Sequence, residues 1–92
     1  MDSLYKKFIK QGIPVVIDEF GALQKNDDDL QGRVNFAAFY AASAAVRGIP
    51  CVWWDNHCFL DGERFGLIDR NEIVWVYPDI AIALLENWKS NR

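Results

Sequence analysis

Apolar and polar positions divide the chain into alternating helical and extended segments. Apolar residues recur at helical spacing over 2–10 and over 30–47, and the second stretch is rich in alanines suited to packing against a sheet. The segments 13–17 and 49–54 are short apolar runs without alternation, typical of strands covered on both faces. With a final helical stretch at 79–88, the pattern predicts the order helix, strand, helix, strand, long loop, helix.

Glycine, proline and acidic residues mark the ends of these elements. Gly12 and Gly48 follow the first two helices, at the position where glycine commonly ends a helix. Pro78 occupies a first-turn position, where proline commonly starts one. The Asn-Asp-Asp-Asp run at 26–29 predicts a capped helix N-terminus rather than a metal site, because these side chains cap free amides and suit the helix dipole. The polar segment 55–70 is expected to be a loop.

Strands that alternate with helices predict an α/β fold with a parallel sheet. Both predicted strands begin with the same Gly-Ile-Pro, at 12–14 and 48–50, which are 36 positions apart. This indicates two copies of one β-α unit. A solenoid of such units is a poorer interpretation because the leucine-rich pattern is missing.

Composition narrows the class of protein. The chain has 92 residues, is 51% hydrophobic, and carries a formal net charge of −3 from 13 acidic and 10 basic residues. This length suits one small domain or part of a larger one, and the apolar content excludes a disordered tail. Because there is no basic run and no apolar stretch long enough to cross a bilayer, we expect neither nucleic acid nor a membrane as partner.

The two cysteines do not form a recognised metal or redox pattern. Cys51 and Cys58 are neither a CxxC pair nor half of a zinc set. We expect two free thiols, although a disulfide and the cellular compartment both stay open. No metal is expected.

Chemistry-bearing side chains follow the C-terminal ends of both predicted strands, where parallel sheets and barrels place active residues. Alternation puts Glu19 on one face with Val15 and Ile17, and Trp54 on one face with Val52. If these are the same side of the sheet, a carboxylate and an indole ring converge on one crevice. That pair suits sugar chemistry, because a pyranose stacks on indole and a carboxylate attacks or stabilises an oxocarbenium-like centre. Each residue taken singly has an alternative interpretation: Trp54 as a core residue and Glu19 as an ion-pair partner.

The residues at these strand ends resemble glycoside hydrolase family 5 endoglucanases. Positions 13–22, IPVVIDEFGA, are similar to the seventh-strand motif of that family, P-V-x-I-G-E-F-G. Positions 48–56, GIPCVWWDN, resemble its eighth-strand W-W-D-N segment. Positions 65–71 and 75–80 resemble its closing loop and last helix. The matches follow one another in order across nearly the whole chain, and together they are specific.

The resemblance implies that residues 1–92 are a C-terminal fragment of a catalytic domain, the last quarter (seventh and eighth β-α units) of a (β/α)8 TIM barrel. It implies retaining endo-hydrolysis of β-1,4-glucan, with Glu19 as the nucleophile and Trp54 as the floor of the subsite of the sugar being cleaved. Asn56 is expected to bind substrate, and His57 either lines the cleft or is a solvated loop side chain. No metal or organic cofactor is implied, and the parent enzyme is expected to be secreted or periplasmic.

Three features depart from the family pattern. Asp18 stands where the family usually has Gly, and alternation places it opposite Glu19, toward the helices, so we expect a tolerated change. His57 stands where Gly is common. The Asn-Glu-Pro motif that carries the family's acid/base Glu is absent, because the Asn-Glu pair at 71–72 is followed by Ile73. The second carboxyl that retaining hydrolysis needs, about 5–5.5 Å from the first, is therefore not supplied by this sequence.

The isolated chain is expected not to be a stable, active monomer, because two parallel strands leave two unpaired edges. The remainder of a barrel, or other copies of the chain, are expected to cover those edges. Two other functions stay open. The same mechanism on mannan or xyloglucan is one, since substrate choice lies in loops outside this chain, and an inactive, self-associating α/β fragment is the other.

Overall fold

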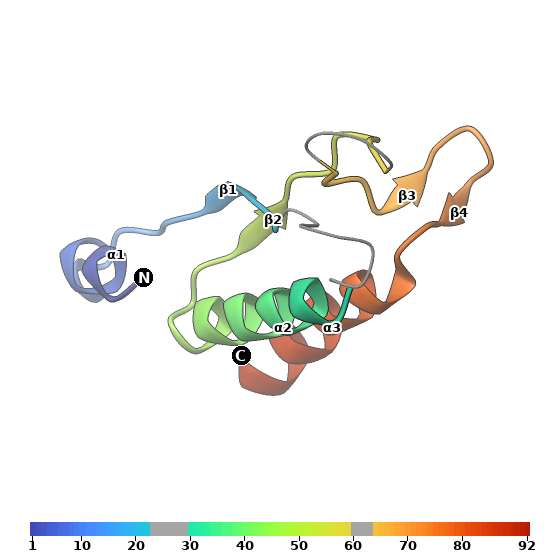
Figure 1. Cartoon of the computed structure of the whole chain (residues 1–92). Coiled ribbons are helices and arrows are strands. Elements are labelled where there is room, and N and C mark those ends of the chain that lie inside the picture. Colours follow the sequence, from blue (N-terminus) through green and yellow to red (C-terminus); the bar gives the residue numbers. More distant parts are fainter. Residues whose placement is uncertain (23–29, 60–63) are drawn as a thin grey trace.

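The computed structural model describes residues 1–22, 30–59 and 64–92 (Figure 1). Its helices and strands follow one another as α1 (Asp2–Lys7), the 3-10 helix η1 (Ile9–Gln11), β1 (Ile17–Phe20), α2 (Leu30–Val46), β2 (Cys51–Trp53), β3 (Ile68–Asp69), β4 (Val74–Trp75) and α3 (Pro78–Asn91). In this part of the chain, no helix is long and apolar enough to cross a bilayer.

The strands form two separate pairs. β1 and β2 are parallel, with Ile17 opposite Cys51 and Phe20 opposite Trp53 and an irregularity between these two positions. β3 and β4 are antiparallel. Figure 1 shows α2 and α3 packed side by side on one side of the β1–β2 pair. The predicted parallel α/β arrangement with a helical crossover is therefore present.

Both long helices agree with the hydrophobic pattern. α2 ends at Val46, and Gly48 follows with a φ of +66°, the left-handed conformation that glycine adopts without strain. α3 starts at Pro78, as predicted, and continues to Asn91. The first helix is shorter than expected because it gives way to η1 after Lys7, and Gly12 (φ +83°) ends that turn. The predicted N-terminal cap at 26–29 lies outside the described residues.

The predicted bounds of the first strand were wrong. The apolar run predicted a strand over 13–17, but β1 spans Ile17–Phe20. Ladder pairing needs a neighbour, and the Ile17 N–H donates to the Pro50 carbonyl at 2.9 Å, where β2 is about to begin. Ile13 and Val16 precede this point and are 51% and 59% exposed. The apolar run thus extends beyond the pairing that this chain can provide.

The hairpin of β3 and β4 was missed. The sequence predicted a loop through this region, because two-residue strands are too short to show a period-2 alternation. The Asp55 carboxylate, at the end of β2, accepts hydrogen bonds from the N–H groups of Leu67 and Ile68 at 3.0 and 3.2 Å. The hairpin is therefore anchored to the parallel strands by a side chain.

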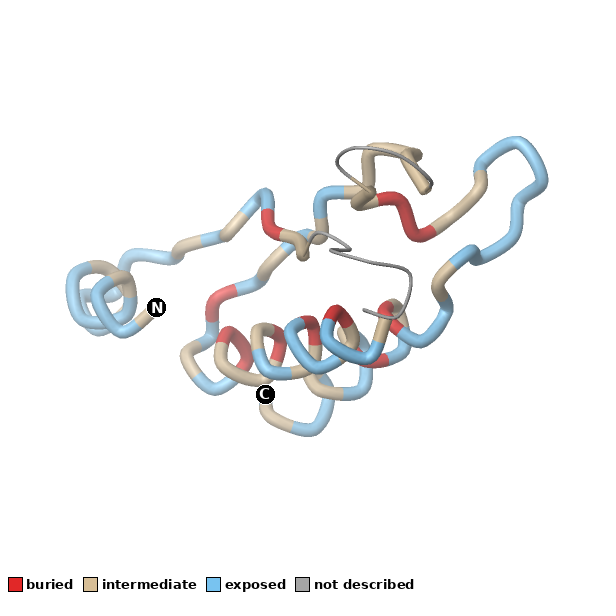
Figure 2. Tube along the Cα trace, viewed as in Figure 1, coloured by how far each residue is buried: buried red, intermediate tan, exposed pale blue. Residues whose placement is uncertain are grey.

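The core lies between α2, α3 and the segment that enters the hairpin. Ala37 and Ile80 are fully buried, and Leu67 and Ala83 nearly so. Small side chains on α2 let α3 approach closely, whereas the sequence predicted that these alanines pack against a sheet. Figure 2 shows most buried positions on the two helices and on the segments that face them.

Phe20 attaches the strands to α2. Its ring stacks on Tyr40 with centroids 4.1 Å apart and meets Trp53 edge-on at 5.5 Å. Burial raises the pKa of the Tyr40 phenol. Because side chains alternate along a strand, burying Phe20 against the helix turns its neighbour Glu19 away from it.

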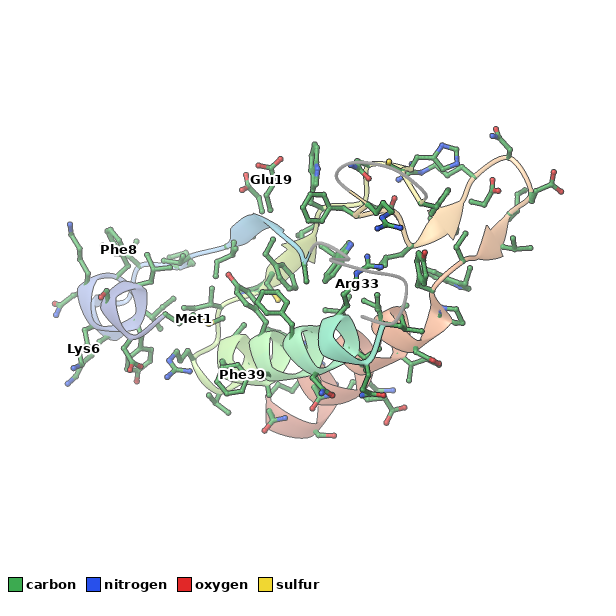
Figure 3. All side chains as sticks on the ribbon, viewed as in Figure 1. Met1, Lys6, Phe8, Glu19, Arg33 and Phe39 are labelled. Carbon is green, nitrogen blue, oxygen red and sulfur yellow. The ribbon has the colours of Figure 1, made fainter. Side chains whose placement is uncertain are left out.

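Arg33 is a buried cation on α2 that connects three segments. Its Nε donates to the Ala22 carbonyl at 3.1 Å, and an Nη donates to the Arg64 carbonyl at 2.9 Å. The guanidinium also lies 4.9 Å from the centroid of the Tyr77 ring, just before α3. Figure 3 shows Arg33 reaching from α2 toward the strand layer. This side chain holds the ends of β1, the hairpin segment and α3 together.

Arg33→Met is expected to lower the free energy of unfolding by about 2–4 kcal/mol, because it keeps the volume but strips two carbonyl groups of their donor. The matched control is Arg47→Met, which removes an ion pair to Asp2 on the surface (2.7 Å) and should change stability far less. Urea denaturation followed by tryptophan fluorescence, at one protein concentration, measures both. Equal losses in the two variants would contradict this role of Arg33.

Candidate active site

Glu19 stands near the end of β1 with its carboxylate outside the core. The side chain is exposed, and Figure 3 shows it projecting from β1 on the side away from α2. Phe20, the next residue, is buried against that helix. The alternation of the strand therefore presents a carboxylate at the carboxyl end of a parallel sheet, where α/β proteins place their reactive groups.

Glu19 and Trp54 line one open hollow of about 220 Å³, together with Phe20, Gly21 and Phe65. The Trp54 N–H donates to the Phe20 carbonyl at 2.7 Å, so the backbones of the two strand ends are joined. The indole is 45% exposed. The predicted convergence of these two side chains on one crevice is therefore present in the structure.

Phe65 is a wall of this hollow that sequence reasoning did not assign to the site. Its carbonyl accepts a hydrogen bond from the Trp53 indole N–H at 2.8 Å. A Cβ added to Gly21 would lie only 2.7 Å from Cδ1 of the Phe65 ring. Gly21 is therefore needed because the ring approaches the backbone closely. The only available signal was the position of Phe65 in the closing loop, far along the chain from Gly21.

Asp55 is a second residue that the sequence did not single out. Besides its bonds to the hairpin, its Oδ1 accepts the His57 N–H at 3.0 Å and lies 3.6 Å from an Nη of Arg70. Its side chain is only 17% exposed. Since Asp55 directly follows Trp54, these bonds fix the backbone that carries the exposed indole. The sequence signal for Asp55 was its position directly after a strand rich in tryptophan.

Asn56 and His57 take part in the loop that follows. The Asn56 Oδ1 accepts the Cys58 N–H at 3.1 Å. The His57 backbone has a φ of +58°, and its ring meets Phe59 edge-on at 5.2 Å. Neither Asn56 nor His57 is among the described residues that line the hollow of Glu19 and Trp54. Their role in substrate binding stays a prediction.

The other polar candidates lie away from the hollow. Asp18 is exposed, and its orientation toward the helices stays a prediction. Both cysteines are free, as expected, and burial raises the pKa of the Cys51 thiol. In the described ranges no cluster of His, Cys, Asp and Glu is suited to hold a metal ion.

Asp69 closes the tight turn of the hairpin. Hydrogen bonds from the backbone N–H groups of Glu72 and Asn71 lower the pKa of its carboxyl, and His57, whose Nε2 lies 3.6 Å from Oδ1, adds to this. The folded state therefore binds fewer protons here than the unfolded chain. The stabilisation is present above the ordinary value of 3.8 and is lost as the pH falls through the lowered pKa.

Asp69→Asn is expected to destabilise the protein at neutral pH, and the difference from the wild type should shrink as the pH falls below 3.8. Denaturation series between neutral and acidic pH measure this. Asp79→Asn, which removes an exposed carboxylate from the first turn of α3, is the matched control. A difference that stays constant across the whole pH range would show that the carboxylate of Asp69 does not act through its ionisation.

Sequence comparison places this geometry in a family. The model of the cellulase family (glycosyl hydrolase family 5) matches residues 1–59. Endoglucanase A of Clostridium longisporum is 42% identical over an alignment of 92 positions that covers 98% of this chain and 17% of that protein. Endoglucanase B of Neocallimastix patriciarum is 45% identical over 87 residues, 94% of this chain and 18% of that protein. The chain thus spans less than a fifth of these two relatives.

Structure comparison gives the same assignment. The family 5 lichenase from Caldicellulosiruptor sp. F32 is 52% identical, with a TM-score of 0.90 over 95% of this chain and 23% of the lichenase. The family model covers more than half of this chain. The lichenase, which is also a family 5 enzyme, aligns along nearly all of the chain. The chain therefore belongs to glycosyl hydrolase family 5 and is a part of a (β/α)8 barrel of that family.

Proposed function

We propose that this chain is the last quarter of a retaining β-glucan hydrolase barrel and supplies its nucleophile, Glu19, and its sugar-stacking platform, Trp54. The observation that carries this proposal is the shared hollow of the two side chains at the carboxyl end of the parallel strands. Membership of family 5 supports the class of reaction. The seventh and eighth β-α units then correspond to β1–α2 and β2–α3.

The reaction proceeds in two displacements. The Glu19 carboxylate attacks the anomeric carbon while a second carboxylic acid protonates the departing glycosidic oxygen, which leaves a glycosyl ester on Glu19. Water, deprotonated by that same second group, then attacks the anomeric carbon and releases Glu19. The second group belongs to the part of the barrel that this chain does not span, about 5–5.5 Å from Glu19.

Aromatic rings position the sugar for this attack. The exposed face of Trp54 stacks on the apolar face of the pyranose, and Phe65 lines the same hollow. Asp55 holds the backbone next to Trp54 through three N–H groups, so the indole is fixed before substrate binds. Asn56 and His57 lie one and two residues further on and line the cleft beyond the hollow.

The substrate is a β-1,4-linked glucan. Relatives named endoglucanase and lichenase support this choice, and a mutant of the Caldicellulosiruptor enzyme, 52% identical to this chain, is solved with cellotetraose. Xyloglucan is a second candidate, because a family 5 xyloglucanase from Paenibacillus pabuli is 32% identical over 95% of this chain, with a TM-score of 0.85. The remainder of a barrel is required for turnover in either case.

Glu19→Gln is expected to abolish hydrolysis of lichenan, by about 10³-fold or more in kcat, while cellotetraose still binds, because the amide keeps the shape but not the nucleophile. The measurement uses the chain fused to the preceding three quarters of the Caldicellulosiruptor lichenase. Glu86→Gln, at an exposed carboxylate of α3, is the control and should retain activity. A Glu19→Gln protein with most of its kcat would place the nucleophile elsewhere.

Trp54→Ala is expected to raise KM for cello-oligosaccharides by about tenfold, with a smaller change in kcat, because it removes a stacking surface and leaves the nucleophile in place. Phe39→Ala is the control, since that ring is 76% exposed on α2 and lines no hollow with Glu19. Steady-state kinetics on the same fusion protein separate KM from kcat. Unchanged KM in Trp54→Ala would remove the indole from the proposed subsite.

A further inference from the structure

The segment that follows β2 is joined to the β3–β4 hairpin by four polar residues (Figure 1). An Nη of Arg70 donates to the Asp55 carbonyl at 3.4 Å and lies 3.6 Å from Asp55 Oδ1. The Arg70 N–H donates at 3.4 Å to His57 Nε2, which also lies 3.6 Å from Asp69 Oδ1. We call Asp55, His57, Asp69 and Arg70 the clasp. Each segment contributes one acid and one nitrogen-bearing side chain, and the contacts cross between the segments.

His57 keeps a side chain where the backbone favours glycine. Its φ of +58° lies in the left-handed region, which strains a residue that has a Cβ. The ring is nevertheless placed by its surroundings, because it meets Phe59 edge-on at 5.2 Å and its Nε2 accepts the Arg70 N–H. Since Nε2 accepts, the proton of the neutral ring lies on Nδ1. Strained positions of this kind concentrate at functional sites, and here the strain keeps an acceptor against the hairpin.

Asp55 connects the clasp to the stacking platform, because it directly follows Trp54. Its carboxylate accepts the His57 N–H at 3.0 Å besides its two bonds to the hairpin. On the other side, the Trp54 N–H donates to the Phe20 carbonyl at 2.7 Å. The indole itself is 45% exposed, so its orientation depends strongly on this backbone. The backbone of Trp54 is thus held by β1 on one side and by the clasp on the other.

We propose that His57 and Arg70 are positioning residues for Trp54, which hold the backbone after it against the hairpin so that the indole is oriented before a sugar binds. His57 does this as the acceptor for the Arg70 N–H, and Arg70 as the donor to Asp55. This inference rests on the proposed function in taking Trp54 as the stacking surface, but not on the role of Glu19. An oriented platform has less disorder to lose on binding, so loosening it raises KM more than it lowers kcat.

A direct contact between His57 and the sugar is the competing role. His57 is not among the described residues that line the hollow of Glu19 and Trp54. Its Nε2, one of the two ring atoms that could meet a hydroxyl, already accepts the Arg70 N–H. His57 can border the cleft and still act through the loop rather than through the sugar. The two roles predict different behaviour when variants are combined.

Substitutions at His57 test the acceptor in the fusion of the lichenase portion with this chain. His57→Asn tolerates the left-handed backbone, but its shorter side chain does not reach Arg70, so KM for cello-oligosaccharides should rise about threefold or more with a smaller change in kcat. His57→Gln returns an acceptor near the place of Nε2 and should keep KM within about twofold of the wild type. Equal KM values for these two variants would overturn the role of the acceptor.

The matched control lies on the same hairpin. Glu72→Gln changes an exposed carboxylate outside the clasp, and KM and kcat should both stay at their wild-type values. Arg70→Met removes the donor to Asp55 and should raise KM as His57→Asn does. An effect of Glu72→Gln as large as that of Arg70→Met would show that any change in the hairpin disturbs binding, and would overturn the specific role of the clasp.

Combination with Trp54→Ala separates positioning from direct binding. Because a positioning residue acts through the platform, His57→Asn should raise KM clearly in the wild type and by less than about 1.5-fold once the indole is gone. If the two effects multiply in the double variant, His57 meets the sugar independently of Trp54, and the proposal is overturned.

Hydrogen exchange reports on the clasp without any substrate. The N–H groups of Leu67 and Ile68 donate to Asp55, so His57→Asn should speed their exchange while the amides of α2 keep their wild-type rates. Faster exchange with an unchanged KM would overturn the link to Trp54 and leave the proposed function standing. An active Glu19→Gln protein would instead refute the proposed nucleophile and leave the inference about the clasp intact.

Discussion

The buried guanidinium of Arg33 is the interaction on which the arrangement of this chain depends. It donates to carbonyls that follow β1 and precede the hairpin, and it lies over Tyr77 at the start of α3. Each of these segments is a loop, and loops in a small protein have few apolar contacts of their own. A cation with several donors in a fixed plane can satisfy carbonyls from different directions at once. The loops that surround the hollow are therefore positioned from the helix layer.

Above this layer, the site is built from alternation and from one carboxylate. Burying Phe20 on Tyr40 turns Glu19 outward, and the same register brings Trp54 beside it. Asp55 then fixes the loop after β2 by accepting three backbone N–H groups, at a position where it contributes no reactive group of its own. The proposed nucleophile Glu19 and the structural acid Asp55 thus both follow a parallel strand, and their hydrogen-bond partners distinguish them.

The sequence predicted the parts of this structure that have a strong local signal. The helix that ends before Gly48 and the one that starts at Pro78 were read from periodicity and from residues whose backbone preferences are strict. The placement of Glu19 and Trp54 followed from strand parity. The helix ends need no information about which segment lies beside which, whereas the convergence of Glu19 and Trp54 also required their faces to lie on the same side of the sheet.

Features that depend on distant partners were not predictable in this way. β1 was predicted too early in the chain. An apolar run predicts burial, whereas the bounds of a strand depend on the neighbouring strand with which it pairs. Phe65 was missed as a wall of the hollow because its contact with Gly21 joins remote positions. Arg33 has the sequence context of an ordinary surface residue on a helix, yet it is 1% exposed. Tertiary contacts determine the bounds of β1, the position of Phe65 and the burial of Arg33.

Two kinds of exposed aromatic residue therefore have to be distinguished in this chain. Trp54 lies beside a carboxylate at a strand end, where we propose that its exposed ring stacks on a sugar. Trp75 lies with Leu84 and Leu85 beside β2, which pairs with β1 alone within the described ranges, and an open ring there is part of an incomplete core. At about 25 cal/mol per Å² of apolar surface, covering a few such side chains is worth several kcal/mol, comparable with the net stability of a small domain. In a (β/α)8 barrel, strand pairing covers the edges of the strands and leaves their carboxyl ends free, so the hollow of Glu19 stays open while the apolar side chains beside β2 are covered.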